Sequence, residues 1–337
     1  MVTNTLVVIP TLNEADTIER VLRALGKQMT GGTGSAIVVV DGGSSDSTPK
    51  IVQRVMVDLP FVRLLNNPAR IQSSGINLAV RTFGDEFDVL VRCDAHAIYP
   101  DNFLSALERS MQVRGADSIV VTMDSKGETC FQKAVAWASD SRIGSGGSAH
   151  RGGSKSGFVD HGHHAAIKLS TFQKLNGYDD TFSHNEDAEF DARLRAEGGS
   201  IFLDADVRLQ YKPRSTVAGL WRQYFNYGRG RSRTVRRHPS SLRLRQFLVP
   251  AHVFFVFVAL LASPWTMVPL TWPLSYLIIL VCLAIAKSIT RRSLCGLLTA
   301  LAALIMHTAW ALGFFWGWLS IRERSWVPGQ KVNMAPQ

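Results

Sequence analysis

Polar and acidic side chains stand directly after several runs of β-branched residues. Pro10, Asn13 and Glu14 follow the first run, Asp41 ends the second, and Asp94 follows a later one. Because open α/β sheets bind ligands at the carboxyl ends of their strands, this pattern predicts one shared ligand site. A carboxylate in the glycine-rich turn DGGSSDST can accept hydrogen bonds from a base or a ribose. The pattern therefore predicts a nucleotide site, and a simple turn with a helix cap is the alternative.

The segment RCDAH carries a candidate metal site. The carboxylate of Asp94 can hold a divalent cation that bridges two phosphates of a donor. In place of a second carboxylate the chain has His96, and imidazole suits Mn²⁺ better than Mg²⁺. Either His96 binds the metal, or it contacts phosphate while Asp94 carries the cation with water. We expect a divalent cation, Mn²⁺ or Mg²⁺, and a purely structural role for His96 is the alternative.

The segment Asn185-Glu186-Asp187 opens a predicted helix after a Gly-Tyr-Asp-Asp turn. Transfer of a group to a hydroxyl acceptor with inversion needs a base that removes the acceptor proton. Asp187 is the candidate base, and Glu186 is expected to orient Asp187 or the acceptor. The alternative is an acidic pair that only complements the helix dipole.

The segments between these motifs predict an α/β domain. Over residues 5–123, Val- and Ile-rich runs alternate with amphipathic stretches, and helices are expected from about Glu14, Thr48 and Asp101. Apolar runs joined by helical crossovers predict a parallel sheet that is covered on both faces. The Gly- and Ser-rich residues 144–157 predict a mobile loop, which could close over a donor as a lid or serve as a plain connector.

The cysteines and the N-terminus narrow the class of protein. The four cysteines lie far apart without a C-x-x-C spacing, so we expect neither a disulfide framework nor a thiolate zinc site. A reducing compartment fits this pattern. The first apolar run is short and follows no basic residue, which argues against a secretory signal.

Three apolar stretches after Gln246, of about 17, 20 and 27 residues, carry no Asp, Glu, Lys or Arg. The last two reach the roughly 20 residues that cross a bilayer, and the first is marginal. We predict two or three transmembrane helices over residues 247–321, between a basic linker over 236–246 and a short tail over 322–337. The positive-inside rule then places a multi-pass protein in the inner membrane with its N-terminal domain in the cytoplasm. A third span would leave Arg322 and Arg324 outside, so a hairpin or a tilted third segment stays open.

The positive charge of the chain is concentrated before these stretches. The net charge is +10, and residues 212–245 hold ten Lys or Arg and no Asp or Glu. Aromatic residues among these cations could indicate a nucleic-acid surface. Their place beside the first apolar stretch instead favours anionic membrane lipid or the diphosphate of a membrane-bound acceptor. We expect no nucleic-acid partner.

Four ordered motifs, VVIPTLNEADTI, VVVDGGSSDST, RCDAH and NEDAEFDARL, resemble those of family 2 glycosyltransferases with the GT-A fold. The resemblance covers roughly residues 5–235 and implies a Rossmann-like nucleotide-sugar-binding domain over residues 1–235 with a mostly parallel central sheet. It implies that Pro10, Glu14 and Asp41 contact the nucleoside. It also implies that Asp94 holds the metal and the ribose-diphosphate, and that Asp187 is the base of an inverting hexosyltransferase.

Further segments, RIQSSGINLAV, GSGGSAHRGG, FVDHGHHAA and WRQYFNYGRGRSRTVRRHP, resemble glucosyltransferases of succinoglycan-type exopolysaccharide biosynthesis. This resemblance implies transfer of glucose in β-1,3 linkage from a UDP-sugar to a polyprenyl-diphosphate-linked saccharide, alongside other polysaccharide assembly proteins. Gln72 joins Asn13 among the implied substrate contacts. Gln223 and Arg231 resemble the Gln-x-x-Arg-Trp element of processive members. Here the spacing differs and no Trp follows, which favours a non-processive enzyme.

Two other functions remain open from the sequence. A polyprenyl-phosphate hexose synthase would share the fold but would use a bare lipid phosphate as acceptor. A catalytically silent scaffold of a polysaccharide assembly complex is disfavoured by the complete set of acidic positions. His161, His163 and His164 could line an acceptor pocket or bind metal, and a structural role is the alternative.

Overall fold

The computed structural model describes residues 4–29, 34–146 and 153–331, and the chain divides into two compact units. The first, which we call the sheet unit, comprises Met1–Asp124, Gly152–Tyr211 and Val327–Gln337. The second, the helical unit, comprises Ser125–Arg151 and Lys212–Trp326. The helical unit thus joins a segment from the middle of the sequence to the apolar C-terminal part.

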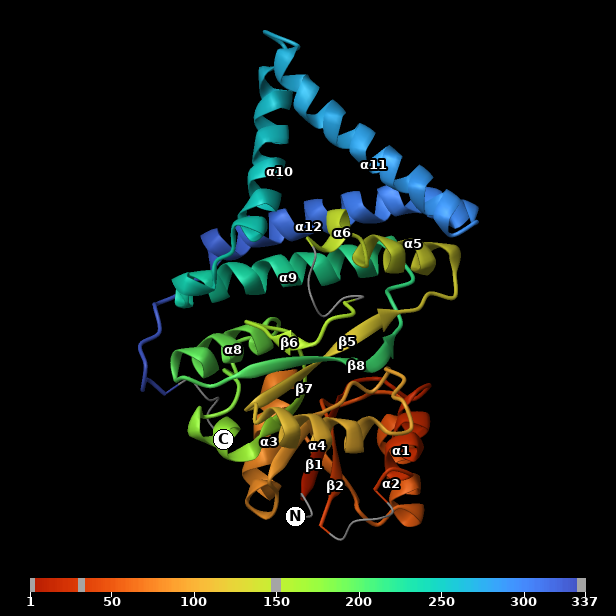
Figure 1. Cartoon of the computed structure of the whole chain (residues 1–337), viewed down its shortest axis with the longest axis vertical. Coiled ribbons are helices and arrows are strands. Elements are labelled where there is room, and N and C mark those ends of the chain that lie inside the picture. Colours follow the sequence, from red (N-terminus) through yellow and green to blue (C-terminus); the bar gives the residue numbers. More distant parts are fainter. Residues whose placement is uncertain (1–3, 30–33, 147–152, 332–337) are drawn as a thin grey trace. The chain divides into compact units, whose positions relative to one another are not determined.

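The sheet unit is built on one sheet with the strand order β3-β2-β1-β4-β7-β5-β8-β6 (Figure 1). Its parallel part consists of β1 (Thr5–Thr11), β2 (Ala36–Asp41), β3 (Val62–Asn66) and β4 (Val89–Arg92). The order of these strands reverses between β1 and β4, which is the usual place for a ligand in an open α/β sheet. Thr11 lies opposite Asp41 in the register, so the motifs that follow β1 and β2 begin side by side.

Helices cover both faces of this sheet, as the apolar periodicity predicts. They are α1 (Ile18–Gly26), α2 (Thr48–Asp58), α3 (Gln72–Phe83), which leads into η1 (Gly84–Glu86), and α4 (Phe103–Arg114). One buried cluster packs against α1, α2 and α4, and a second packs against α3 on the opposite face. The stripe of Ile18, Val21, Leu22 and Leu25 is buried, which confirms the spacing argument for the first helix.

The second half of the sheet contains antiparallel pairs of strands, which the sequence did not indicate. The predicted strand SIVVTM forms β5 (Ser118–Ser125), but β7 (His163–Lys168) lies between β4 and β5 and is antiparallel to both. The short β6 (Gly157–Phe158) pairs with β8 (Ile201–Tyr211). Because β7 is antiparallel to both β4 and β5, β5 runs in the same direction as β4. The predicted mostly parallel sheet is therefore confirmed, and β7 is an antiparallel strand inserted into it.

Two further helices complete the sheet unit, α7 (Leu169–Lys174) and α8 (Glu186–Ala196). The predicted glycine-rich loop over residues 144–157 is only partly described. Its ends belong to α6 (Arg142–Ser145) and β6, whereas residues 147–152 lie outside the described residues. A lid function for this loop therefore stays a prediction.

The helical unit contains the apolar segments together with α9. Its helices are α5 (Cys130–Ser139), α6, α9 (Val217–Arg237), α10 (Leu244–Ala262), α11 (Thr271–Thr290) and α12 (Leu298–Ser320), with short 3-10 turns η2 (Pro239–Ser241), η3 (Val268–Leu270) and η4 (Leu294–Leu297). Leu220 of α9 shares a buried cluster with Ala302 and Met306 of α12 and with Leu280 of α11. By compactness α9 thus belongs with the apolar helices, although the catalytic domain predicted from the sequence extends to residue 235.

Glycines allow α9 and α12 to pack backbone against backbone. A Cβ atom on Gly228 would lie 1.9 Å from the carbonyl oxygen of Trp310, and one on Gly313 would lie 2.0 Å from that of Phe225. A Cβ atom on Gly317 would lie 2.3 Å from Oγ of Ser232. Larger residues at these positions would force the two helices apart.

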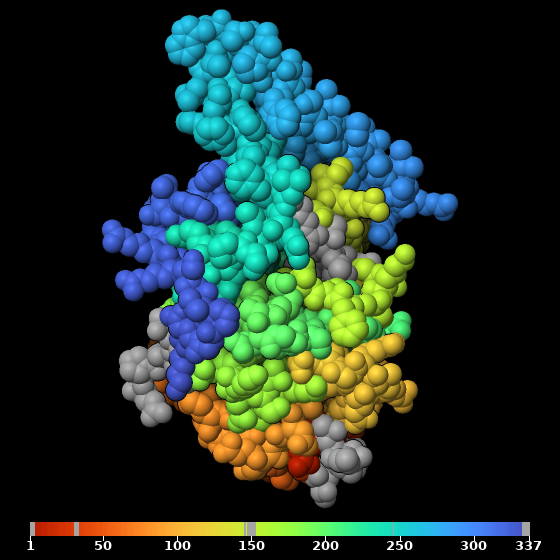
Figure 2. All heavy atoms as spheres, turned by 60° about the vertical axis from the view of Figure 1, so that its left-hand side comes forward, coloured from red at the N-terminus to blue at the C-terminus, as the bar shows by residue number. Residues whose placement is uncertain are grey.

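Two helical stretches, Val268–Thr290 and Leu294–Ser320, are long and apolar enough to cross a membrane by length and composition, and Gln246–Ala262 forms a shorter apolar helix. Figure 2 shows the surfaces of α10, in cyan, and α11, in blue, with their side chains open along much of their length. Phe254, Phe257, Ile278 and Val281 are among the apolar side chains that they expose. These findings support membrane association, as the sequence predicts.

The expectation that no disulfide forms is wrong for one pair of cysteines. Cys130 at the start of α5 and Cys295 in η4 are joined by a disulfide bond within the helical unit. Cys93 is buried and Cys282 is exposed, and both are free. The two bonded residues are 165 positions apart, so only the tertiary structure brings them together.

We predict that Gly313→Val will destabilise the helical unit, because its side chain has to displace the backbone of α9. Overpacking of this kind typically costs about 1–3 kcal/mol. Thermal unfolding in detergent should give a lower Tm for Gly313→Val. The matched control Leu312→Val, which changes an exposed neighbouring side chain, should keep the Tm. Equal Tm values for both variants would contradict the close helix contact.

Candidate functional site

The turns after β1 and β2 are tied together by hydrogen bonds. The Asn13 amide oxygen accepts a bond from the Ser45 N–H at 2.8 Å, and the Asn13 N–H donates to Oγ of Ser44 at 2.8 Å. The Glu14 N–H donates to Oγ1 of Thr48 at 2.8 Å, which joins the first turn to the start of α2. Asn13 has a φ of 57°, a left-handed conformation that asparagine tolerates better than most residues. The sequence prediction that these two motifs share one site is therefore consistent with their geometry.

Asp41 organises its own turn. Its Oδ2 accepts hydrogen bonds from the N–H groups of Gly43 and Ser44, both at 3.0 Å, and its Oδ1 accepts one from the Ser44 hydroxyl at 2.5 Å. Asp41 is buried, and Pro10 lies opposite Val40 on the adjacent strand. Contacts from Asp41 and Pro10 to a nucleoside remain predictions, and Asp41 has in addition a structural role as an anchor of the glycine-rich turn.

Asp94 follows β4 and keeps its carboxylate oriented towards charged and polar neighbours. The Asp94 N–H donates to the hydroxyl oxygen of Tyr99 at 2.6 Å, which fixes the backbone. One oxygen of the Asp94 carboxylate lies 3.7 Å from Nε2 of His163. His96, in contrast, has its Nδ1 2.9 Å from Oε1 of Glu14, so the predicted site residues Glu14 and His96 contact each other.

Electrostatics keeps Asp94 ionised. Burial alone would raise the pKa of its carboxyl group, but His163, Arg92 and His96 outweigh this effect and hold the pKa below its usual range. Burial, together with the charge of Arg92, also lowers the pKa of His163 to about 4, against the opposing pull of Asp94. His163 is thus neutral at pH 7, so we attribute the stabilisation of the Asp94 charge mainly to Arg92.

A buried ion pair joins β4 to the start of α8. Nη2 of Arg92 lies 3.0 Å from Oε1 of Glu186, and both side chains are almost fully buried. Gln72 at the start of α3 can orient its amide oxygen to accept from Nε and Nη2 of Arg92, at 3.2 and 2.7 Å. Nη1 of Arg92 is buried and has no hydrogen-bond partner among the described residues. An anionic or hydroxyl-bearing ligand would satisfy this donor.

Glu186 and Asp187 are adjacent, but their environments differ. Burial raises the pKa of Glu186 against the opposing effect of Arg92. Burial would also raise the pKa of Asp187, yet His161, His164 and Arg92 together bring it well below its usual value of 3.8. Asp187 is therefore ionised at neutral pH, as a base has to be. A low pKa also makes a carboxylate a weaker base.

A carboxylate between two histidines lies one helical turn beyond Asp187. Asp191 is buried, and its two oxygens lie 2.7 Å from Nδ1 of His161 and 2.7 Å from Nε2 of His164. Nδ1 of His164 lies 2.7 Å from the hydroxyl of Tyr178. Because residues four apart share a face of a helix, this network lies on the face of α8 that carries Asp187.

The histidines of this network were expected from the sequence as candidate site residues, but Asp191 was not. The signal that could have found it is the spacing of Asp187 and Asp191 in NEDAEFDARL, which places two carboxylates on one face of a helix. Neither ring nitrogen of His164 is left for a metal ion, since both have close polar partners. For His164 the structure thus favours a structural or positioning role.

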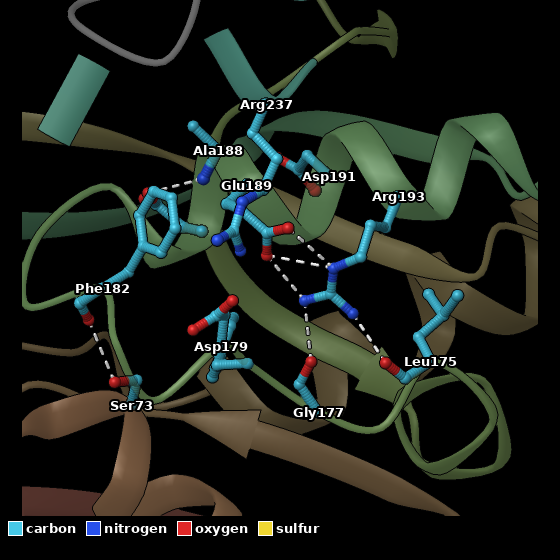
Figure 3. A network of polar contacts seen from close by, with 12 residues as sticks. Ser73, Leu175, Gly177, Asp179, Phe182, Ala188, Glu189, Asp191, Arg193 and Arg237 are labelled. Carbon is cyan, nitrogen blue, oxygen red and sulfur yellow. Dashed lines mark hydrogen bonds and ion pairs between the residues drawn. The ribbon is translucent and has the colours of Figure 1, made fainter. Parts of the chain in front are cut away.

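Other acidic residues near the start of α8 hold the backbone. Asp179 accepts hydrogen bonds from the N–H and hydroxyl of Thr181, and Asp180 accepts one from the Asn77 amide. Figure 3 shows Glu189 paired with Arg193, whose other donors reach carbonyl oxygens of the preceding turn. These bonds anchor the turn that delivers Asn185 and Asp187, so Asp179, Asp180 and Glu189 already have structural roles.

The predicted residues Gln223 and Arg231 belong to α9 of the helical unit. Nε2 of Gln223 donates to the hydroxyl of Tyr227 at 3.1 Å. Nη2 of Arg231 donates to the Ser241 carbonyl oxygen at 2.6 Å and to Oε1 of Gln246 at 2.8 Å. Arg231 therefore holds the turn between α9 and α10. Roles for both residues in substrate binding stay predictions.

The described residues include no group of three or more His, Cys, Asp or Glu side chains that could hold a metal ion alone. A metal carried partly by donor phosphates needs fewer protein ligands. One oxygen of the Asp94 carboxylate lies 3.7 Å from Nε2 of His163, which is neutral at pH 7 and too far away for a hydrogen bond. Asp94 therefore fits a cation bound jointly with a ligand, whereas His96 in its present orientation is directed to Glu14.

Comparison with known proteins assigns this arrangement to a family. A model of the family described as glycosyl transferase family 2 matches residues 6–175, half of the chain, including the turns after β1, β2 and β4. The chain belongs to glycosyl transferase family 2. It is a glycosyltransferase, as the ordered motifs of the sequence predict.

One curated relative is similar along almost the whole chain. The succinoglycan biosynthesis protein ExoA of Rhizobium meliloti (strain 1021) is 41% identical over 325 residues, which cover 96% of this chain and 97% of that protein. Among solved structures, the mannosyltransferase PcManGT from Pyrobaculum calidifontis, in complex with GDP-Man and Mn²⁺, matches with a TM-score of 0.63. Its identity is 18%, over 94% of this chain and 88% of that chain, which confirms the GT-A fold alone.

We predict that His161→Gln will shift the pH dependence of this glycosyltransferase. Loss of the histidine raises the pKa of Asp187, and an Asp187 base is active above its pKa and inactive below it. The acidic limb of kcat/KM should therefore move to higher pH. The control His252→Gln, in α10 of the helical unit, should keep the wild-type profile. Identical profiles for both variants would remove His161 from the environment of the base.

Proposed function

We propose that this family 2 glycosyltransferase is an inverting, non-processive enzyme of succinoglycan-type exopolysaccharide biosynthesis. It transfers a hexose, glucose in β-1,3 linkage, from a UDP-sugar to a polyprenyl-diphosphate-linked saccharide. Similarity to the succinoglycan biosynthesis protein ExoA over 96% of the chain supports the pathway. Other proteins of polysaccharide assembly are its expected partners.

The geometry around Arg92 is the observation that carries the enzymatic part of this proposal. Arg92 pairs with Glu186, and its charge lowers the pKa of both Asp94 and Asp187. The carboxylate assigned to the donor diphosphate and the carboxylate assigned to the acceptor proton are thus stabilised by one buried cation. A donor phosphate or sugar hydroxyl would in addition pair with Nη1 of Arg92.

The turns after β1 and β2 would bind the nucleoside through Pro10, Asn13, Glu14 and Asp41. Gln72 can accept two hydrogen bonds from Arg92. It would act on the donor by holding this arginine in position. Asp187 would remove the proton from the acceptor hydroxyl while that oxygen attacks the anomeric carbon from the face opposite the leaving diphosphate. Glu186, held by Arg92, would keep Asp187 and the acceptor in position.

A divalent cation fits the carboxylate of Asp94, as described above. When bound there, it would offset the negative charge that develops on the departing diphosphate. His96 contacts Glu14 in this structure. If His96 moves from Glu14 to bind the cation, Mn²⁺ is favoured, because imidazole prefers this softer ion; otherwise the site suits Mg²⁺.

The apolar helices support a location at the inner membrane, with the sheet unit in the cytoplasm. Nucleotide sugars are made in the cytoplasm, and the cations of residues 212–245 precede the first apolar helix. There they would bind anionic lipid or the diphosphate of the acceptor, for which Gln223 and Arg231 are the predicted contacts.

The proposed reaction is tested directly by incubating membranes that contain the protein with labelled UDP-glucose and either lipid acceptor. The extended glycolipid should form from the polyprenyl-diphosphate saccharide, and mass spectrometry should show one added hexose. A product formed only from bare polyprenyl phosphate would instead identify a polyprenyl-phosphate hexose synthase. Donor binding with no product from any lipid would indicate a scaffold.

We predict that Asp94→Ala will weaken donor binding and remove its dependence on metal, because the variant lacks the carboxylate assigned to the cation. Calorimetric titration with UDP, with and without Mn²⁺, measures both effects. Asp58→Ala, which removes an exposed carboxylate paired with Arg23 at the C-terminal end of α2, serves as a control. Unchanged metal-dependent UDP affinity in Asp94→Ala would refute the metal assignment.

We predict that Asp187→Asn will keep donor affinity but reduce transfer by about 10²–10⁴-fold, the usual cost of losing a general base. A base that acts only in the transition state should lower kcat and kcat/KM together. Glu186→Gln should be milder if Glu186 only orients its neighbours. Near-normal transfer by Asp187→Asn with an unaltered pH profile would exclude Asp187 as the base.

A further inference from the structure

The helix α9 is too charged to cross a membrane. It contains Arg222, Arg229, Arg231, Arg233, Arg236 and Arg237 and no acidic residue. Charged side chains in the hydrocarbon region are costly unless they face a polar interior. A helix that packs along α9 over its whole length therefore has to stay near the aqueous side of the membrane as well.

Helix α12 packs along α9 in this way. At its start, Ala302 and Met306 share a buried cluster with Leu220 of α9. In its middle, Gly313 lies against the backbone of Phe225. The contact positions rise together along both helices, so the two helices run parallel and side by side, as Figure 1 also shows.

Charged groups hold the end of α12. Nη1 and Nη2 of Arg236 donate to the carbonyl oxygens of Ile321 and Gly317, which are among the last acceptors of the helix. Beyond the helix, Glu323 pairs with Arg233 and with Arg237, and its side chain is almost fully buried. At the other end, the disulfide bond of Cys295 ties the turn before α12 to α5. Both ends of α12 are thus attached to other segments of the helical unit.

The opposite face of α12 is apolar and exposed. It includes Leu301, Leu304, Leu312, Trp316 and Leu319. One face of α12 thus packs on the cationic helix α9, while the other face is free to contact lipid. The 23 residues of α12 would be long enough to cross the membrane. Because α12 packs along the charged helix α9, however, its length alone does not determine its orientation.

Unlike α12, the helices α10 and α11 do not pack along a charged helix in the described part of the chain. Apolar side chains are exposed on several sides of both helices, and at about 1.5 Å per residue their 19 and 20 residues correspond to roughly the thickness of the bilayer core. Their connection carries Trp265 and Met267, both largely exposed, and no charged residue. The cations Arg243, Arg291 and Arg292 lie at the opposite ends of the two helices.

We propose that α10 and α11 form the membrane-crossing hairpin of this protein, whereas α12 lies along α9 in the cytoplasmic interface of an anionic bilayer. Two crossings keep the segment after α12 on the same side as α9. Arg322 and Arg324 then remain with the other cations, as the positive-inside rule requires. The proposal concerns the helical unit alone and does not depend on the donor or the acceptor.

Single cysteines in the full-length chain test this arrangement. Thr266→Cys marks the connection between α10 and α11, and Arg324→Cys marks the segment after α12, both at exposed positions. Intact spheroplasts and inside-out vesicles are treated with a membrane-impermeant maleimide, and the labelled peptides are identified by mass spectrometry. The unmodified chain corrects for its own cysteines.

We expect at least tenfold more labelling of Thr266→Cys in spheroplasts than in vesicles, and the reverse for Arg324→Cys. Labelling of both positions in spheroplasts would show that α12 crosses the membrane and would overturn the proposal. Labelling of Thr266→Cys only in vesicles, or from neither side, would overturn the crossing hairpin.

The depth of the helices gives an independent measurement. An environment-sensitive fluorophore is attached to Leu312→Cys in α12 and to Ile279→Cys in α11, two exposed apolar positions near the middle of their helices. Quenching by lipids brominated at different depths should place Leu312→Cys near the headgroups and Ile279→Cys near the bilayer centre. Equal depth at the centre would contradict the interfacial position of α12.

Discussion

The buried ion pair between Arg92 and Glu186 connects the two segments that carry the acidic residues of the site. Arg92 is two residues from Asp94, and Glu186 is next to Asp187, so this one contact ties together the backbone segments that carry the two carboxylates. Breaking a buried pair by removing one partner typically costs about 3–5 kcal/mol, because the other charge stays uncompensated. The geometry of the site therefore depends on an ion pair that is already formed without substrate.

Arg92 also stabilises the negative charges of Asp94 and Asp187, which are both buried. Asp94 and Asp187 each raise the energy of the other's ionised form, and burial adds to this cost. Arg92 compensates at both carboxylates, together with His163 and His96 at Asp94 and with His161 and His164 at Asp187. The price is a base with a low pKa, which is ready at neutral pH but intrinsically weak. An anionic donor placed between these groups would act against the stabilising cations and make Asp187 more basic.

Much of the sheet unit follows from patterns of short range. Runs such as AIVVVD predict buried strands, and the residues after them were correctly expected at one edge of the sheet. The antiparallel β7 was missed because its pairing partners are distant in sequence. Its residues, HHAAIK, also lack the Val- and Ile-rich run that is typical of a buried parallel strand. Asp191 was missed because its partners come from a distant segment. The membrane helices were recognised by composition, but the contact of α12 with α9 depends on Gly228 and Gly313, whose importance appears only when two backbones meet.

The disulfide bond between Cys130 and Cys295 closes a loop of 165 residues and fixes the turn before α12 to α5. Disulfides are rare in proteins exposed to the cytosol, where thioredoxin and glutathione keep thiols reduced. If this turn lies on the cytoplasmic side, the bond competes with those systems, and two covalent forms of the protein can coexist. A sample purified with dithiothreitol and one purified without it would then be different molecules with different freedom at the end of α12. The reductant used during extraction from the membrane thus determines whether Cys130 and Cys295 are bonded in the purified protein.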